Sequence, residues 1–585
     1  MEAPAEGDRA VPQEESGARP RRPIERRIAA AALTLLPGIL IVFFSFNGGG
    51  YFAGSVGFAA LVVSQMIAVR VLVVDEPFAG FSRPLAAVGG ALALFTGWVL
   101  ASGLWSNAQD RALIEFDRAL LYLLLLVLMG LLPRRAYRVM WIVRGCAAAA
   151  VAVCAAGLIS RILPHVWPTS PGVSNQRLSF PLTYWNALGI LAAVGLLLTV
   201  ALATSDRESR ISRAIAAAAV PILATTLLFT FSRGAIAVAI IGTLVYFVIA
   251  RQRALVAGAI AILPPTAIAL VVAYGADELA TVHPATARGV AQGKDVALAV
   301  GLCVLAVGGL RYLLAPLDRR MSDVTISAEV RRRLRLGAAT ALVSIVVVVL
   351  LAGGGSWLSD QYHAFIRGGA PPTADLRARL VDPSSNGRTD HWRAALDGFS
   401  AHPFHGTGAG TYEFTWDRHR RLVFDVVDAH GLYFETLSEL GMVGLVLLLT
   451  VILAVLVTLA RRARGLNRGY YAGLFAAGLA WAIHAGVDWD WEMPAVTLAA
   501  IFCGLVLLKA EPETIGDRAL GIGFRLAGAG AVIAVVAFTF LALIGNSAAS
   551  ASATAAQSRN WAKAASEART AHTWLPWSSD PWRLD

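Results

Sequence analysis

The sequence predicts an all-α, polytopic integral membrane protein, and three observations lead to this fold class. Hydrophobic residues make up 57% of the 585 residues, whereas charged residues make up only 15%. The apolar residues form long blocks, and a helix needs about 20 of them to cross the hydrocarbon core of a bilayer. Lys and Arg are concentrated in alternate short loops, which is typical of the cytoplasmic side of a membrane protein. We therefore expect about 14 to 15 membrane helices.

The expected membrane helices form two groups, which one long loop separates. Residues 28–352 hold the N-terminal group, and residues 431–545 hold the C-terminal group. The first apolar block is longer than that of a signal peptide and another block follows it at once, so we expect an uncleaved membrane helix. The expected helices begin near Ile28, Tyr51, Leu85, Leu113, Val139, Pro181, Ala214, Ala235, Ala254, Val296, Gly337, Gly431, Tyr470, Pro494 and Leu520.

The two ends of the chain differ from the membrane segments in composition. Residues 1–27 are rich in Pro, Glu and Arg, which predicts a disordered arm on the cytoplasmic side. Residues 546–585 join an Ala-rich segment to a Pro- and Trp-rich end, which resembles the start of a tetratricopeptide-like helical pair on the exterior side. One such unit cannot bury a solenoid core, so we expect it to pack on the exterior face or on a partner.

The basic charge of the chain reports its orientation in the membrane. The formal net charge is +11, and the positive residues lie mainly in the arm and in the loops expected on the same side as the arm. This distribution argues against a nucleic-acid-binding surface, although some attraction to anionic membrane lipids is expected.

The longest expected exterior loop, residues 353–430, is much longer than an ordinary connection, and loops of such length are usually functional. Within it, residues 389–400 have apolar residues at helical spacing, which predicts a short helix. The glycine-rich stretch "HPFHGTGAGTY" follows, and Asp428 and His430 stand just before the next apolar block.

Three segments in this order resemble the signature of the O-antigen ligase and polymerase superfamily: "FTFSRGAIAVAIIGTLVYF", "GRTDHWRAALDGFSAHPFHGTGAGTY" and "DAHGLYFETLSELGMVG". The chain departs from the family pattern at Gly431, where the family often has Asn. The resemblance implies a GT-C-like glycosyltransferase of the bacterial cytoplasmic membrane. It would move a glycan from an undecaprenyl-diphosphate carrier to a hydroxyl of a glycan or lipid acceptor on the exterior side. A ligase uses a lipid or surface acceptor, whereas a polymerase uses another lipid-linked repeat.

Such a reaction needs positive charge for the departing diphosphate, and three arginines are candidates for this role. Arginine binds phosphate oxygens through a planar fork and stays charged. Arg177, Arg233 and Arg388 are all expected on the exterior side, where positive charge is otherwise scarce. The alternative for each is an interface arginine whose charged end reaches the membrane surface.

His430 is the candidate base for the acceptor hydroxyl. If Asp428 caps the following helix, His430 lies in its first turn, where the helix dipole and nearby arginines favour a neutral ring that can accept a proton. The alternative is a histidine that only anchors the membrane interface. Glu439 is expected to pair with an arginine and to hold the geometry of the site, with Asp428 as a second supporting residue.

The turn "DWDWE" offers the only metal hypothesis of note. Asp488 and Asp490 could hold Mg²⁺ or Mn²⁺ near a diphosphate. We prefer a hydrated turn with its tryptophans at the membrane interface, and we expect no metal or other cofactor. His402 and His405 are too few for a zinc site. A transporter of glycans or small solutes is the alternative of another class, but it would use polar groups near the midplane and inverted repeats, and the sequence shows no such repeat.

Overall fold

The computed structural model describes most of the chain. The described part excludes residues 1–23, 75, 79, 132–135, 170–176, 253, 282–285, 324–328, 331, 334–335, 338–339, 341–343, 345–347, 349–354, 368–373, 422–424, 466, 505–520, 577 and 579–585. Two expectations therefore lie mainly outside it: the N-terminal arm and the membrane helix that begins near Gly337.

The regular secondary structure of the described residues is helical, apart from one isolated bridge between Thr281 and Asp375. Two of the helices are short 3-10 turns, η1 (Gly48–Gly50) and η2 (Asp277–Ala280). The α-helices are α1 (Ile24–Ser45), α2 (Ala53–Val73), α3 (Arg83–Ser102), α4 (Gln109–Gly130), α5 (Ala136–Ile162), α7 (Trp185–Thr204), α8 (Arg210–Ala218), α9 (Val220–Thr230), α10 (Arg233–Ala250), α11 (Ala254–Tyr274), α12 (Ala287–Leu313), α13 (Ala315–Asp323), α15 (Gly355–Arg367), α16 (Ala378–Val381), α17 (Arg388–Ala401), α18 (Tyr412–His419), α19 (Leu432–Arg462), α20 (Arg468–Ala485), α21 (Pro494–Cys503), α22 (Ile522–Gln557) and α23 (Trp561–Trp574).

Ten helices of the described part are long and apolar enough to cross a membrane, counting α8 and α9 as one. Two shorter apolar helices, Leu35–Ser45 and Pro494–Cys503, accompany them. The protein is therefore an all-α, multi-pass membrane protein, as the sequence predicts. The number expected from the sequence is higher. Part of the difference is α4, which packs against α2 and α3 but is not among the ten, because its apolar stretch carries Glu115, Asp117 and Arg118. Such charges inside a membrane helix are costly and rare.

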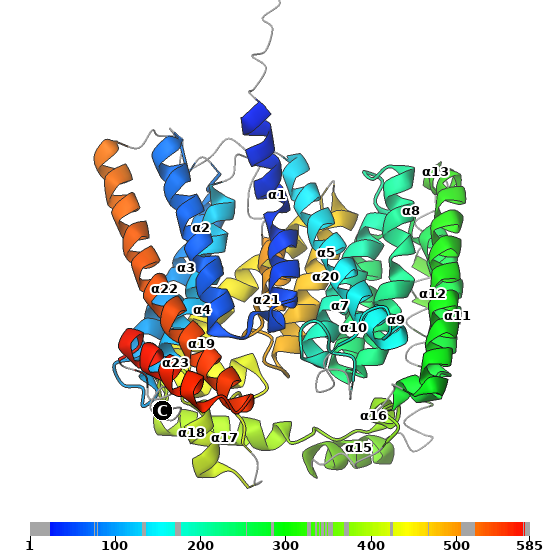
Figure 1. Ribbon diagram of the computed structural model, residues 1–585. Coiled ribbons are helices and arrows are strands. Elements are labelled where there is room, and N and C mark those ends of the chain that lie inside the picture. The colour runs from blue at the N-terminus through cyan, green and yellow to red at the C-terminus, as the bar shows by residue number, and fades with distance from the viewer. Residues whose placement is uncertain are drawn as a thin grey trace, which may run out of the picture.

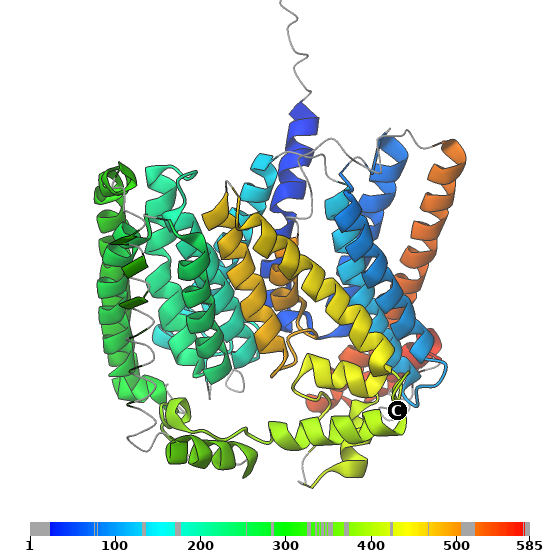
Figure 2. The same cartoon turned by 180° about the vertical axis from the view of Figure 1, so that it is seen from behind.

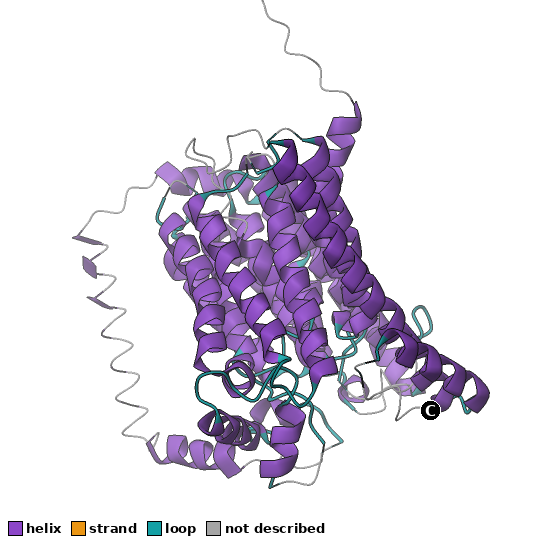
Figure 3. Cartoon of the chain, turned by 90° about the vertical axis from the view of Figure 1, so that its left-hand side faces the viewer, coloured by secondary structure: helices purple, strands orange, loops and turns teal. Residues whose placement is uncertain are grey.

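The long helices stand side by side, and the described part of the loop 353–430 covers one end of the bundle (Figure 1). This loop is called the exterior loop after the side on which it is expected. Helices α15 to α18 lie beyond this end, whereas α8, α13 and the start of α1 lie at the opposite end (Figures 1 and 2). Figure 3 shows loops and short helices gathered beneath the long helices on the side of α17. Helix α17 (Arg388–Ala401) confirms the helix expected over residues 389–400.

The expected orientation of the bundle in the membrane can be tested by labelling a cysteine placed at each end. Asp206 is exposed in the loop before α8, and Ser400 is exposed on α17, while all four native cysteines are buried. With the arm cytoplasmic, an impermeant thiol reagent applied to intact cells should label Ser400→Cys and leave Asp206→Cys unlabelled until the membrane is opened. Labelling of both variants in intact cells would contradict this orientation.

The C-terminal residues form a helical hairpin at the end of the bundle where the exterior loop lies (Figure 1). Helix α22 continues without a break past residue 545 to Gln557, and α23 packs back against it. Ser578 beyond α23 donates a hydrogen bond from its Oγ to Oδ2 of Asp110 at 2.9 Å. The tail thus contacts the start of α4.

Helix α19 begins the C-terminal group and is kinked near its start. Gly441 has φ 65° and ψ −164°, and an added Cβ there would lie 2.3 Å from the carbonyl oxygen of Phe404. Only glycine tolerates this combination of a left-handed backbone and a close approach. The kink leaves the carbonyl of Leu440 to accept a hydrogen bond from the indole N–H of Trp98 at 3.0 Å. The first turns of α19 can therefore tilt under the exterior loop while the rest crosses the bundle.

Candidate functional site

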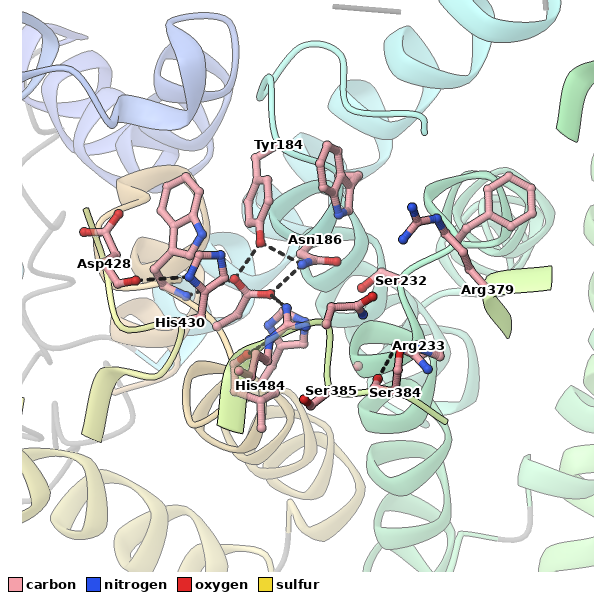
Figure 4. A pocket seen from close by; sticks show the side chains of 18 of the residues that line it. Tyr184, Asn186, Ser232, Arg233, Arg379, Ser384, Ser385, Asp428, His430 and His484 are labelled. Carbon is pink, nitrogen blue, oxygen red and sulfur yellow. Dashed lines mark hydrogen bonds and ion pairs between the residues drawn. The ribbon is translucent and has the colours of Figure 1, made fainter. Parts of the chain in front are cut away.

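A cavity of about 910 Å³ lies where α17 meets the first turns of α7 and α10 and the last turn of α20 (Figure 4). It brings together side chains that are far apart in the sequence. Residues expected to form the site that line it are Arg177, Arg233, Arg388, Asp428, His430 and Asp488. The two other expected residues, Glu439 and Asp490, are buried and do not line it.

Arg388 is the first residue of α17, and it is fixed from two directions. Its Nε donates to the carbonyl of Val487 at 2.7 Å, and its Nη2 donates to Oδ2 of Asp488 at 2.9 Å. Asp488 also accepts from the hydroxyl of Tyr184 at 2.7 Å and from the amide of Asn186 at 2.6 Å. Burial opposes ionisation of Asp488, but Arg388 and neighbouring histidine rings outweigh it and lower its pKa below the ordinary value. Asp488 is therefore an ionised anchor that orients Arg388.

Arg233 is the first residue of α10, and Ser232 caps that helix by accepting from the N–H of Ala235 at 3.4 Å. The Nη2 of Arg233 donates to the carbonyl of Ser384 at 2.8 Å, and its Nη1 lies 4.0 Å from Oδ2 of Asp382. The exterior loop thus holds this guanidinium at the cavity wall, and among the described residues only a distant carboxylate balances its charge.

Two further arginines, Arg177 and Arg379, reach the same cavity. The guanidinium of Arg177 lies 3.9 Å from the ring centroid of Trp185. Within the described part of the chain, neither Arg177 nor Arg379 forms an ion pair. Burial, Arg379 and Arg388 together lower the pKa of Arg177 to about 9. A bound anion would remove this repulsion, so the wall is suited to a multiply charged ligand such as a diphosphate.

His430 has a defined tautomer. Its Nδ1 lies 3.1 Å from the backbone carbonyl oxygen of Asp428. A carbonyl oxygen can only accept, so Nδ1 carries the proton and Nε2 keeps its lone pair when the ring is neutral. Burial and the charge of Arg388 lower the pKa of His430, and Asp488 opposes them only in part. The ring is therefore neutral at pH 7 and can accept a proton at Nε2.

The expected reason for this neutrality was partly wrong. Helix α19 begins at Leu432 with Gly431 as its N-cap, and no side chain caps it. Asp428 is not the cap, and His430 precedes the helix instead of lying in its first turn. The left-handed backbone of His430, with φ 50°, turns the chain so that the backbone of Asp428, not its carboxylate, supports the ring. Burial, more than the helix dipole, keeps the imidazole uncharged.

Aromatic side chains hold the His430 ring in place. The ring of His391 from α17 stacks on it with 5.2 Å between centroids and 15° between planes. Burial, His430 and Arg388 lower the pKa of His391 to about 3, so no second charge develops beside the base. The indole N–H of Trp392 donates to the carbonyl of His430 at 3.2 Å. A Cβ on Gly431 would lie 2.9 Å from that indole nitrogen, which explains why Asn does not fit there in this chain.

The two glutamates at the start of α19 hold backbone N–H groups. Glu439 accepts from Gly410 at 3.0 Å and from Tyr412 at 2.8 Å, and Glu435 accepts from Ala429 at 2.7 Å. The expected arginine partner of Glu439 was wrong, because the glycine-rich loop packs here and its N–H groups need acceptors. Glu435, and not Glu439, is the glutamate that holds the backbone between Asp428 and His430, through the N–H of Ala429.

The glycine-rich loop approaches α19 more closely than any side chain would permit. Gly406 has φ 70°, and an added Cβ would lie 2.3 Å from the carbonyl of Glu439. The N–H of Gly408 then donates to that same carbonyl at 2.8 Å. Gly406 thus allows the loop to pack against α19, whereas an added Cβ on Gly408 or Gly410 would meet Ser106 or Arg111.

Removal of the Glu439 carboxylate should weaken the fold before it affects the chemistry. Glu439→Ala leaves two buried N–H groups without their acceptor, each worth roughly 1–3 kcal/mol. We expect a lower unfolding temperature in detergent and a smaller loss for Glu439→Gln, which keeps one acceptor oxygen. Glu329→Ala is the control, because Glu329 forms an exposed pair with Arg333 that contributes little. Equal unfolding temperatures for Glu439→Ala and the control would contradict this role.

The turn "DWDWE" is buried and is not the hydrated turn expected from the sequence. Asp488 and Asp490 are each 1% exposed, and Glu492 is 3% exposed. Asp490 pairs with His484, with 2.6 Å between Oδ2 and Nδ1, while Asp488 binds Arg388. Among the described residues, no group of three or more His, Cys, Asp or Glu is arranged to hold a metal ion. The two aspartates have separate protein partners, so the geometry does not favour the metal hypothesis.

A family comparison covers the central part of this site. Residues 292–449 match the family model described as O-antigen ligase. This region, called the O-antigen ligase domain after the family model that it matches, covers about a quarter of the chain. The match confirms the resemblance seen in the sequence and implies a membrane glycosyltransferase-like enzyme. The O-antigen ligase domain includes Arg388, His430 and Glu439, whereas Arg233 precedes it and Asp488 follows it. No curated protein matches the chain.

Sequence reasoning missed two residues that line the cavity beside the O-antigen ligase domain motifs, Arg379 and His484. Arg379 follows a bridge that ties the loop to η2, where Leu376 donates to the carbonyl of Ala280 at 2.8 Å. No motif marks that bridge. For His484 a signal was present, because a histidine at the end of an apolar helix, six residues before an aspartate, is an unusual place for an ionisable group.

Proposed function

We propose that the protein transfers a glycan from a polyprenyl-diphosphate carrier to an acceptor hydroxyl, as an O-antigen ligase does. The site would face the exterior side of the bacterial cytoplasmic membrane. The observation that supports this most is a single cavity at one end of a membrane bundle with four arginines and one neutral histidine in its wall. Positive charge for a leaving diphosphate and a base for a hydroxyl are the two requirements of this transfer.

In the proposed transfer, one bond forms and one bond breaks at the anomeric carbon of the donor. The acceptor oxygen forms a bond to the anomeric carbon, and the bond between that carbon and the phosphate oxygen breaks. The bonding electrons leave with the lipid diphosphate, whose charge Arg388 and Arg233 stabilise. The acceptor proton passes to Nε2 of His430. Asp488 orients Arg388 throughout, and Arg177 and Arg379 add positive charge at the wall.

The test is a transfer assay with purified protein in vesicles and a polyprenyl-diphosphate-linked glycan as donor. One arm adds a lipid acceptor and the other adds only further lipid-linked donor. We expect a glycosylated lipid acceptor and released polyprenyl diphosphate, with EDTA causing no loss. Growth of the lipid-linked glycan without any transfer to the lipid acceptor would make the protein a polymerase. Absence of both products would contradict the proposal.

A further inference from the structure

A second histidine at the cavity wall, His484, takes no part in the reaction described above. It lies at the end of α20, and its Nδ1 is 2.6 Å from Oδ2 of Asp490. Both side chains are 1% exposed. An ionised carboxylate only accepts hydrogen bonds, so Nδ1 is the donor, and so short a contact is typical of a charge-assisted hydrogen bond. Asp490 therefore fixes the ring and favours its protonated form.

The other nitrogen of His484 lies against the first turn of α10. A Cβ on Gly234 would lie 3.3 Å from both Cδ2 and Nε2 of His484. No described residue forms a hydrogen bond with Nε2. His484, Gly234 and Arg233 all line the cavity, and Figure 4 shows His484 and Arg233 as parts of the same wall. The Nε2–H of His484 thus lies at the cavity wall, where the described part of the chain gives it no acceptor.

The start of α10 adds its own attraction for negative charge. The first N–H groups of an 18-residue helix have no partner inside the helix, and the helix dipole makes this end positive. Anions bind readily at such an end. Gly234 has no side chain, so the His484 ring lies directly against the first turn of α10, beside Arg233 in the cavity wall.

We infer that His484, held by Asp490, is a ligand of the donor diphosphate, and that its Nε2–H donates to a phosphate oxygen at the start of α10 beside Arg233. This rests on the proposed function, because the diphosphate is the anion expected in the cavity. His484 donates through both ring nitrogens in this arrangement, so it is an imidazolium. The charged groups around it are Asp490 and Asp488 in the turn after α20, Arg388 from α17 and Arg233 from α10. His430 is thus the neutral base, and His484 is the cationic ligand.

The experiment measures binding of inorganic diphosphate to the purified full chain in detergent by titration calorimetry. A hydrogen bond between charged groups predicts about 10- to 100-fold weaker binding for His484→Ala and His484→Gln. Asp490→Asn should weaken binding less, because the imidazole remains but loses its anchor. His484→Gln keeps the volume of the ring, so it covers the case in which His484→Ala does not fold. The control is His402→Ala, because His402 is exposed and does not line the cavity.

The pH dependence of diphosphate binding shows whether His484 is a ligand of the diphosphate or only a structural residue. The ratio of dissociation constants between His484→Gln and wild type should shrink as pH rises and the imidazolium loses its proton. The titration of diphosphate itself cancels in this ratio. Wild-type binding by both His484 variants, together with weak binding by Arg388→Ala, would overturn the inference and leave the proposed function standing. Wild-type binding by Arg388→Ala as well would overturn both.

Discussion

Arg388→Ala should reduce glycan transfer by about 10²–10³-fold, which is the usual cost of removing one group that stabilises developing charge. Among the four arginines of the cavity wall, Arg388 is held by two hydrogen bonds, to Val487 and Asp488. Lysine can supply the charge but not the planar fork that spans two acceptors, so Arg388→Lys should recover only part of the rate. The measurement is the rate of polyprenyl diphosphate release in vesicles with saturating acceptor.

The same contact complicates the experiment, because Asp488 is buried and would lose its cation. Breaking a buried pair by removing one partner typically costs about 3–5 kcal/mol. The double variant Arg388→Ala/Asp488→Asn removes the stranded charge, so it should unfold at a higher temperature than Arg388→Ala and remain as inactive. Arg393→Ala is the matched control, because Arg393 lies on the same helix, pairs with Asp390 and is 42% exposed. A double variant that folds and transfers at the wild-type rate would remove Arg388 from the site.

The sequence predicted the fold class because it follows from a strong physical pattern. Apolar blocks of membrane-spanning length have few other structures open to them. Arg177, Arg233 and Arg388 stood out as candidates for diphosphate binding on the side expected to be exterior, and the cavity unites them. The short helix α17 was also predictable from the spacing of its apolar residues.

The partners within the site could not be predicted in the same way, because they depend on tertiary packing. Glu439 faces backbone N–H groups because the glycine-rich loop packs on α19, and nothing in the pattern of either segment reveals that contact. Asp488 looked like a solvated turn residue, yet Tyr184 and Asn186, about 300 positions earlier, bury it. The dihedral angles at His430 likewise come from the way the chain enters α19, not from the residue type alone.

A second residue of the wall competes with His430 for the role of base. Burial and Glu115, opposed in part by Arg118 and Arg111, raise the pKa of Asp428 to about 7. A base must be deprotonated, so the transfer rate falls as pH decreases through the pKa of the group that acts. If His430 is the base, kcat/KM declines only below its ordinary pKa of 6.5, because the cavity lowers that value. If Asp428 is the base, the decline is centred near pH 7.

His430→Asn should slow transfer by about 10²–10⁴-fold, the usual contribution of a general base, while donor binding stays close to that of wild type. Asparagine is the sharper substitution, because it tolerates the left-handed backbone at φ 50° better than alanine and cannot act as a base at neutral pH. Binding should persist, because the arginines supply most of the attraction for the diphosphate. The two quantities are measured on one preparation, as the dissociation constant for inorganic diphosphate and as the rate of transfer against pH. Loss of binding as severe as the loss of rate would make His430 a binding or structural group. A wild-type rate in His430→Asn, with the decline still centred near pH 7, would assign the proton to Asp428 instead.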